Sequence, residues 1–160
     1  MSRSSPRRIW ELRAGRALLL AFVLAGAGGP AVGQVLAAFT IENGAISQPL
    51  TGGPGNPARG RLIVRDTGRV TCLICHSFPI PEEPDQGEIG PSLRGVGLRY
   101  TPGQLRLRLV DPKTINPATI MPSYYRVADL NMVLSQYRGQ PIYSAEQIED
   151  VVAYLASLRE

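Results

Sequence analysis

The sequence contains very little cysteine and histidine, and both are concentrated in one place. Its 160 residues include two Cys and one His. They occur together in the stretch VTCLICHSF, as Cys72, Cys75 and His76. So few cysteines exclude a disulfide-rich scaffold, and a lone histidine excludes a metal site with two imidazole ligands. These three residues are therefore the first candidates for the protein's chemistry.

Aromatic residues and regular strand patterns are also scarce. Aromatics make up 6% of the chain, whereas prolines number 14, and prolines interrupt regular elements. No segment shows a convincing strand pattern. The run LRLRLV at residues 105–110 does alternate, so a short amphipathic strand stays open there as an alternative to a helix. We expect an all-α domain of three to four helices joined by long loops.

The first 33 residues have the organisation of a secretory signal peptide. Five arginines precede and flank an apolar run, ALLLAFVLAGAGG at 17–29, which is too short to span a bilayer comfortably. The AVG before Gln34 is a small-residue cleavage signal, and Ala37 is a second candidate end. A transmembrane anchor and a buried core helix are the alternatives, and a twin-arginine signal fits less well. We expect a periplasmic protein with an extended N-terminal arm at 34–55 and a domain at 56–160.

Removal of this presequence changes the net charge of the chain. The formal net charge of +4 comes from 17 basic and 13 acidic residues. The presequence holds five of the basic residues and one acidic residue, Glu11, so 12 of each remain and the mature chain is close to neutral. The basic character therefore belongs to the presequence. It gives no support for binding to nucleic acid or to a membrane surface.

The first helix of the domain is predicted to begin at residues 56–57. Asn56 is a good N-cap and Pro57 suits the first helical position ahead of ARGRLIVRD. Gly60 inside this helix costs about 1 kcal/mol relative to Ala. Such a glycine usually marks a close approach to the backbone of another element.

Two further helices carry capping boxes, in which a hydroxyl and a glutamine side chain cap each other's backbone. Thr101 with Gln104 precedes the helix expected in PGQLRLRLV, and Ser144 with Gln147 precedes the one expected in AEQIEDVVAYLASLRE. A fourth helix is expected in VADLNMVLSQYRG, residues 127–139. The segments between these helices are long and proline-rich. A core of this size does not organise such loops unaided, which points to a large apolar cofactor.

The order Cys-x-x-Cys-His is the attachment signature of haem c. Two thiols three positions apart reach both vinyl groups on one side of a porphyrin, and the adjacent imidazole becomes an axial ligand of the iron. A thioredoxin-like pair requires an α/β sheet, a structural zinc site requires a fourth ligand, and a Cys–His nucleophile leaves one cysteine unexplained. We expect one covalent haem c, bound through Cys72 and Cys75 and ligated by His76.

The second axial position on the iron has four candidates: Met121, Met132, a water molecule or an open site. Met132 falls in an expected helix, where a methionine is explained by packing in the hydrophobic core. Met121 falls in NPATIMPSY between two prolines, and Pro122 favours an extended conformation that lets the thioether project inward. We therefore favour Met121. Ligation by His and Met raises the reduction potential and suits electron transfer.

The turn IGPSLRGVG provides a candidate partner for the imidazole. The carbonyl of Gly90 or Pro91 is placed to accept the proton on the other ring nitrogen of His76, which would select its tautomer; a plain turn is the alternative. A helix before Cys-x-x-Cys-His, a Gly-Pro-x-Leu turn after it, and a Met-Pro loop before an amphipathic C-terminal helix together resemble the class I cytochromes c. This resemblance implies that fold, with the first and last helices crossing closely at Gly60.

A more specific similarity extends from about Leu50 to the C-terminus. The segments GPSLRGVG, RLRLVDPK and NPATIMPSYY, followed by YSAEQIEDVVAYLASLR, resemble the SoxX family of monohaem cytochrome subunits in sulfur oxidation. This resemblance implies a heterodimer with a SoxA-type haem subunit that carries the catalytic cysteine. It also implies that thiosulfate is coupled to a cysteine of a carrier protein, and that a downstream cytochrome accepts the electrons.

The function implied is that of a non-catalytic, electron-accepting subunit in an L-cysteine S-thiosulfotransferase complex. The sequence agrees, because it has no third cysteine once two are used on haem. A free-standing soluble electron shuttle is the main alternative, although diffusing shuttles often use a charged face to steer encounter. A haem peroxidase or ligand sensor would require Met121 to leave the iron, and a distal histidine is lacking. A thiol–disulfide module without haem is the last alternative.

Overall fold

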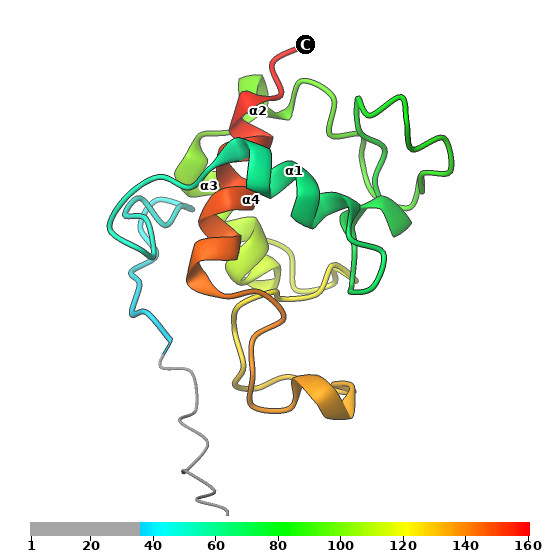
Figure 1. Ribbon diagram of the computed structural model, residues 1–160. Helices are drawn as coiled ribbons and strands as arrows, with labels where there is room; N and C mark the ends of the chain where they lie inside the picture. Colours follow the sequence, from blue (N-terminus) through cyan, green and yellow to red (C-terminus); the bar gives the residue numbers. More distant parts are fainter. Residues whose placement is uncertain (1–35) are drawn as a thin grey trace, which may run out of the picture. The chain divides into compact units, whose positions relative to one another are not determined.

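The computed structural model describes residues 36–160, and this part of the chain is built from helices and loops (Figure 1). It contains no strand within those residues, only an isolated bridge between Glu42 and Ala45. The all-α prediction is therefore confirmed, and the predicted signal peptide lies outside the described residues. The elements are α1 (Pro57–Arg65), η1 (Cys72–Ile74), α2 (Val96–Arg99), α3 (Pro102–Val110), η2 (Pro112–Thr114), η3 (Ser135–Tyr137) and α4 (Ala145–Ser157), where η denotes a 3-10 helix.

The three helix starts read from capping residues are confirmed. The side chain of Asn56 accepts hydrogen bonds from the amides of Ala58 and Arg59 at the start of α1. Both capping boxes form, at the starts of α3 and α4. The run LRLRLV is helical, so the strand alternative is wrong. Within the part of the chain that the structure describes, no helix has both the length and the apolar character to cross a bilayer.

The helix expected at 127–139 is the one element that the structure contradicts. Only the short η3 forms there, and the backbones of Asp129 and Met132 adopt left-handed φ angles of 54° and 55°. A helix needs an apolar face packed against a core, because propensity alone rarely stabilises it. The apolar residues of this segment do not find such a face: Leu134 is 60% exposed and Met132 is fully exposed.

Helices α1 and α4 cross at closest approach where α1 has its glycine (Figure 1). A Cβ atom at Gly60 would overlap the backbone carbonyl of Asp150 and lie 2.8 Å from the Cβ of Tyr154. Val64 on α1 and Val151 on α4 are completely buried. The predicted reason for the glycine is therefore confirmed: only a residue without a side chain lets the two backbones meet.

Helices α3 and α4 are joined by a buried ion pair. The guanidinium of Arg106 donates to both carboxylate oxygens of Glu149, at 2.6 and 2.7 Å, and the two side chains are 3% and 1% exposed. Arg106 also donates to the carbonyl of Ile46 at 2.6 Å, and the amide of Leu50 donates to Glu149 at 2.9 Å. The same two charges therefore also hold residues 46–50 of the predicted N-terminal arm against the helices.

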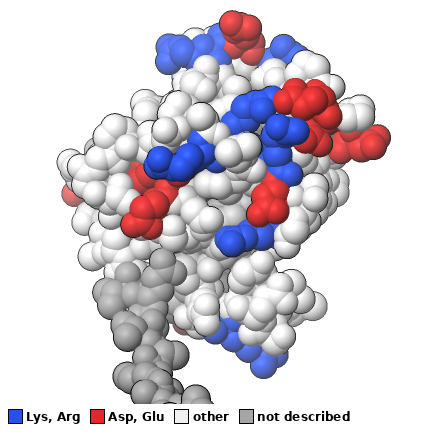
Figure 2. Space-filling view, viewed as in Figure 1, with Lys and Arg blue, Asp and Glu red and all other residues white. Residues whose placement is uncertain are grey.

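The proline-rich loop after the cysteine motif is held by polar contacts as well as by Phe78 and Ile80, which are buried in the hydrophobic core. Arg61 and Arg65 of α1 form ion pairs with Glu82 and Glu83 of this loop. The side chain of Gln86 donates to the carbonyls of residues 80 and 83 and accepts from the amide of residue 78. Figure 2 shows basic and acidic side chains interspersed over the upper part of this face. Opposite charges are therefore distributed together rather than gathered into one patch.

Replacement of Gly60 by Ala should destabilise the protein, because the added methyl group has no room at the helix crossing. We expect a loss of about 1–3 kcal/mol in the free energy of unfolding, as for other overpacked sites. Gly53→Ala is the control, since a Cβ there meets nothing within 4 Å. Urea unfolding of the haem-loaded protein measures both. Equal stabilities would contradict the close crossing of α1 and α4.

Replacement of Arg106 by Leu should have a larger effect, because it leaves the Glu149 carboxylate buried without its cation. The expected loss is about 3–5 kcal/mol, the usual cost of breaking a buried pair from one side. Arg69→Leu removes the exposed pair with Asp66, 3.6 Å apart with side chains 47% and 48% exposed. That control should cost less than about 1 kcal/mol. Similar losses in the two variants would show that the buried pair is not structurally important.

Candidate functional site

The cysteine motif begins at the turn that follows α1. The hydroxyl of Thr71 donates to the carbonyl of Val64 at 2.5 Å and accepts from the amide of Leu73 at 3.4 Å, which starts η1. The amide of His76 then donates to the carbonyl of Cys72 at 2.9 Å. This compact turn brings both cysteines and the histidine onto one short stretch of backbone, tied to the buried end of α1.

A second segment runs alongside the motif and holds it in place. The amides of Gly87, Gly90 and Leu93 donate to the carbonyls of Leu73, Cys75 and Ser77, at 2.8, 2.7 and 2.8 Å. These bonds connect the motif with the Gly-Pro turn more than ten residues later. The position of the histidine is therefore set by two chain segments.

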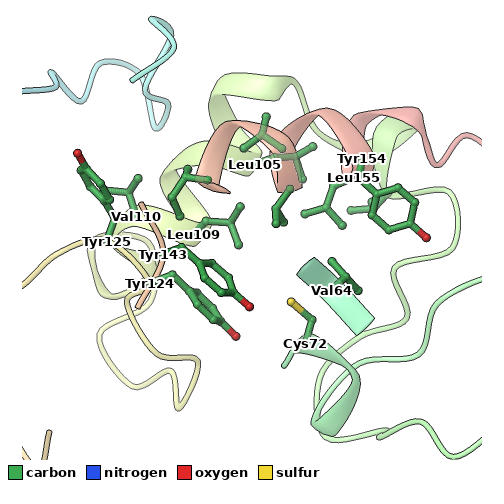
Figure 3. Close-up of a cluster of buried hydrophobic side chains, with 14 of the residues drawn as sticks. Val64, Cys72, Leu105, Leu109, Val110, Tyr124, Tyr125, Tyr143, Tyr154 and Leu155 are labelled. Carbon is green, nitrogen blue, oxygen red and sulfur yellow. The ribbon is translucent and has the colours of Figure 1, made fainter. Parts of the chain in front are cut away.

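The two thiols, both free in the structure, lie in different environments. Cys72 is buried, and its sulfur points into the space between the rings of Tyr124 and Tyr143 and the side chain of Leu155 (Figure 3). Burial raises the pKa of the Cys72 thiol to about 11. Redox-active cysteines instead have lowered pKa values and exposed thiolates, so Cys72 lacks the properties of a thiol–disulfide catalyst.

His76 is held by the turn that the sequence analysis singled out. Its Nδ1 lies 2.7 Å from the carbonyl oxygen of Pro91. Since a carbonyl only accepts, Nδ1 carries the proton and Nε2 keeps its lone pair for a metal. Gly90 lies directly against the imidazole, and a Cβ there would be 2.6 Å from Nδ1. The turn therefore orients the ring and leaves the lone pair of Nε2 available for a metal.

A cavity of about 740 Å³ opens beside these residues. Its size is in the range of cofactor sites, and its walls are mainly apolar. Cys72, Cys75 and His76 line it together with Met121, so the structure brings all four candidate residues to one cavity. Its remaining walls come mainly from the Gly-Pro turn, α2, α3, the proline-flanked loop that carries Met121, and Leu155 of α4.

The two methionine candidates are separated by the structure. Met121 is half-buried and lines the cavity, whereas Met132 is fully exposed and does not line it. The loop that carries Met121 is braced by Lys113, whose ammonium donates to the carbonyls of Pro117 and Thr119 at 3.3 and 3.0 Å. Met121 is therefore the methionine placed to reach a metal in this cavity.

The adjacent tyrosines of the Met121 loop have different roles. Tyr124 lines the cavity and stacks on Tyr143, with ring centroids 4.8 Å apart, and burial raises the pKa of its hydroxyl. The hydroxyl of Tyr125 instead accepts a hydrogen bond from the amide of Ala37 at 2.6 Å. Neighbouring residues of an extended segment point to opposite sides, but the sequence does not show which of the two sides faces the cavity.

Two arginines at the cavity were missed by the sequence analysis. Arg99 and Arg108 line it, and no other arginine and no lysine of the described residues does so. Arg99 donates to the carbonyls of Ser92 and Arg94, at 2.7 and 2.9 Å. The guanidinium of Arg108 lies 3.7 Å from the centre of the Tyr100 ring. These two guanidinium groups add positive charge to a mainly apolar cavity. Positive charge suits the carboxylates of a porphyrin.

These features fit haem c. The thiols of Cys72 and Cys75 lie one turn apart, and the carbonyl of Pro91 accepts a hydrogen bond from Nδ1 of His76. The thioether of Met121 lines the same cavity. The walls are mainly apolar, and Arg99 and Arg108 add positive charge to them. When bound, haem supplies a one-electron couple whose potential depends on its axial ligands.

Comparison with known proteins identifies the family. The family model for cytochrome c matches residues 57–159. A chain in the crystal structure of SoxXA from P. pantotrophus is 36% identical, with a TM-score of 0.66, and the match covers 76% of this chain and 95% of that one. Ferric cytochrome c-550 from Paracoccus versutus is 19% identical over 66% of this chain and 99% of that one, and its TM-score of 0.38 is too low to support an argument. No curated protein matches.

The family match covers all of α1 to α4, and the SoxXA match spans nearly the whole of its chain. The all-α architecture and the cavity with its Cys-x-x-Cys-His motif agree with both. The chain therefore belongs to the cytochrome c family, in its SoxX branch, as an electron-transfer cytochrome of the SoxAX type that carries covalently bound haem c.

Proposed function

We propose that this chain is the periplasmic electron-accepting subunit of a SoxAX-type heterodimer that oxidises thiosulfate. The observation that carries the proposal is the shared cavity, where both cysteines, the histidine and Met121 meet. All the cysteine of the sequence is at this cavity. The proposal gains support from the 36% identity with a chain of the SoxXA crystal structure from P. pantotrophus.

Each site residue has a distinct role in this proposal. Cys72 and Cys75 form the two thioether bonds to one haem, and His76 ligates the iron through Nε2. The carbonyl of Pro91 keeps the proton on Nδ1, which fixes the tautomer and makes the imidazole a better donor. Met121 completes the axial pair. With both axial positions filled by protein, the site favours electron transfer over oxygen or peroxide chemistry.

The catalytic thiol of the complex lies on another chain in this proposal. Joining thiosulfate to a cysteine sulfur forms one S–S bond, releases the thiol proton and removes two electrons. Both cysteines here are used on haem, so the SoxA-type subunit provides the catalytic cysteine of the L-cysteine S-thiosulfotransferase. This subunit has one haem and takes one electron at a time, so it must pass the first to a downstream cytochrome before accepting the second. The thiosulfate group ends on a cysteine of the carrier protein.

The compartment follows from the presequence rather than from the fold. Residues 1–33 are proposed to be a signal peptide removed on export, with residues 34–55 as an N-terminal arm and 56–160 as the cytochrome domain. Free cysteine pairs tend to form disulfides in an oxidising compartment. Covalent haem c is compatible with such a compartment, because both thiols are then held in thioether bonds.

Substitution of the two methionines should separate the ligand from the exposed residue. In Met121→Ala we expect the reduced protein to bind carbon monoxide, and its reduction potential to fall by on the order of 0.1 V, within the roughly 0.8 V range that axial ligands span. Met132→Ala should change neither property, because that side chain is fully exposed. Optical titration and potentiometry measure both. Carbon monoxide binding by the unsubstituted protein would contradict axial ligation by Met121.

An affinity pull-down tests the heterodimer. The tagged chain is recovered from the periplasm of its own host grown on thiosulfate, followed by haem staining and mass spectrometry. We expect a second haem protein in equal amount, with a cysteine near its haem. Recovery of the haem-loaded chain alone, at low salt and high concentration, would reject the heterodimer in favour of a free electron shuttle.

A further inference from the structure

A groove of about 530 Å³ lies next to the haem cavity. The two share a wall formed by Val70 and residues 119–122, which include Met121. The opposite side of the groove is residues 127–142, here called the η3 segment. Residues 127–139 of this segment were predicted to form a helix, and in Figure 1 the segment extends away from the helices as a loop that carries η3. The groove thus connects the loop of the proposed iron ligand with an extended surface segment.

The groove exposes apolar side chains that the chain's own packing does not cover. Ile120 is 79% exposed, Leu134 is 60% exposed and Met132 is 101% exposed, and all three line the groove. Met132 is also held at a φ of 55°, a conformation that costs non-glycine residues free energy. Clustered apolar exposure of this kind marks interaction sites.

The charge of the groove indicates what would cover it. Its lining contains Lys113 and Arg126 but only one acidic residue, Asp129. Arg126 lies 3.5 Å from Asp111, and its buried Nε has no hydrogen-bond partner among the described residues. Lys113 is the one lysine of the sequence. It is exposed, and its two hydrogen bonds in the described chain go to neutral carbonyls. Because Arg126 is paired with Asp111, Lys113 is the cation of this apolar groove that has no acidic partner among the described residues.

We propose that this groove is the docking site for the haem-bearing partner subunit, which inserts an apolar segment with a carboxylate that meets Lys113. The inference rests on the proposed heterodimer and specifies where its partner binds. Apolar contacts with Met132 and Leu134 provide the affinity, and the carboxylate fixes the orientation. Because the groove shares its wall with the haem cavity, a docked partner touches the loop that carries Met121. Docking there places the partner at the edge of the electron-transfer site.

The first test measures binding to the haem subunit recovered in the pull-down. Leu134→Ser and Met132→Ser, in the haem-loaded chain, should each weaken binding by about tenfold or more, as expected when an interface anchor is lost. Leu62→Ser is the matched control: Leu62 is 64% exposed on α1 and lines neither the groove nor the cavity. Its affinity should equal that of the unsubstituted chain. Haem content and thermal stability should be unchanged in all three variants.

The second test uses the single lysine. A carbodiimide joins an amine to a carboxylate without a spacer, so a cross-link to the partner should map to Lys113, and peptide analysis separates it from the N-terminal amine. Lys113→Arg keeps the positive charge but does not couple. That variant should lose this cross-link and keep its affinity within about twofold. A cross-link only at the N-terminal amine would overturn the role of Lys113.

The outcomes distinguish this inference from the proposed function. If the unsubstituted chain binds the haem subunit and both Ser variants bind equally well, the heterodimer stands and the docking site is wrong. If the unsubstituted chain recovers no haem subunit, the heterodimer and the docking site both fail. Self-association of the haem-loaded chain that disappears in Leu134→Ser would assign the groove to a second copy and overturn the proposal.

Discussion

The contact between α1 and α4 at Gly60 is the constraint on which the rest of the site depends. It brings the backbone of α1 against that of α4, which no other residue type would allow. The buried end of α1 then anchors the cysteine motif, because Thr71 is bonded to the carbonyl of Val64. Leu155 of α4 and Cys72 of the motif line the same cavity as a result. A shift of this crossing would move both cysteines relative to the opposite wall of the cavity.

The buried pair of Arg106 and Glu149 has a complementary role on the other side of α4. Burying two charges is costly, and the attraction between them repays this only when every hydrogen-bonding group is satisfied. That condition is met here, since the pair also satisfies the carbonyl of Ile46 and the amide of Leu50. The pair therefore specifies one register of α3 against α4, together with one path for the segment before α1. Apolar contacts alone would discriminate less sharply between alternative registers.

The cavity is completed by loops, and each is held by backbone groups close to the residue it presents. The Gly-Pro turn is bonded to the cysteine motif and in return fixes the imidazole through Pro91. The Met121 loop is braced by Lys113 and continues through Tyr124 along the end of α3. These loops also form the surface around the site. The chemistry of electron transfer and the surface available to a partner thus depend on the same loop.

Much of the fold was predictable because its signals are local. The N-cap at Asn56 and the capping boxes before α3 and α4 act over three residues, so they specify helix starts wherever the helix packs. The segment 127–139 shows the limit of such signals. Its apolar residues are spaced as in a helix, but no core face is available to them, and without packing the helix does not form. The pairing of Arg106 with Glu149 was not predictable either, because in LRLRLV the arginine reads as a solvent-facing residue.

The sequence by itself determined the chemistry of the site, because the spacing of Cys72, Cys75 and His76 is a covalent property of the chain. It also determined where three helices begin. The proline-flanked position of Met121 favoured it over Met132, in agreement with the cavity. The tertiary structure alone decided which of two adjacent tyrosines lines the cavity and which apolar residues stay on the surface. The reason is that spacing and capping act within a few residues, whereas burial and pairing join residues far apart in the sequence, and only packing brings them together.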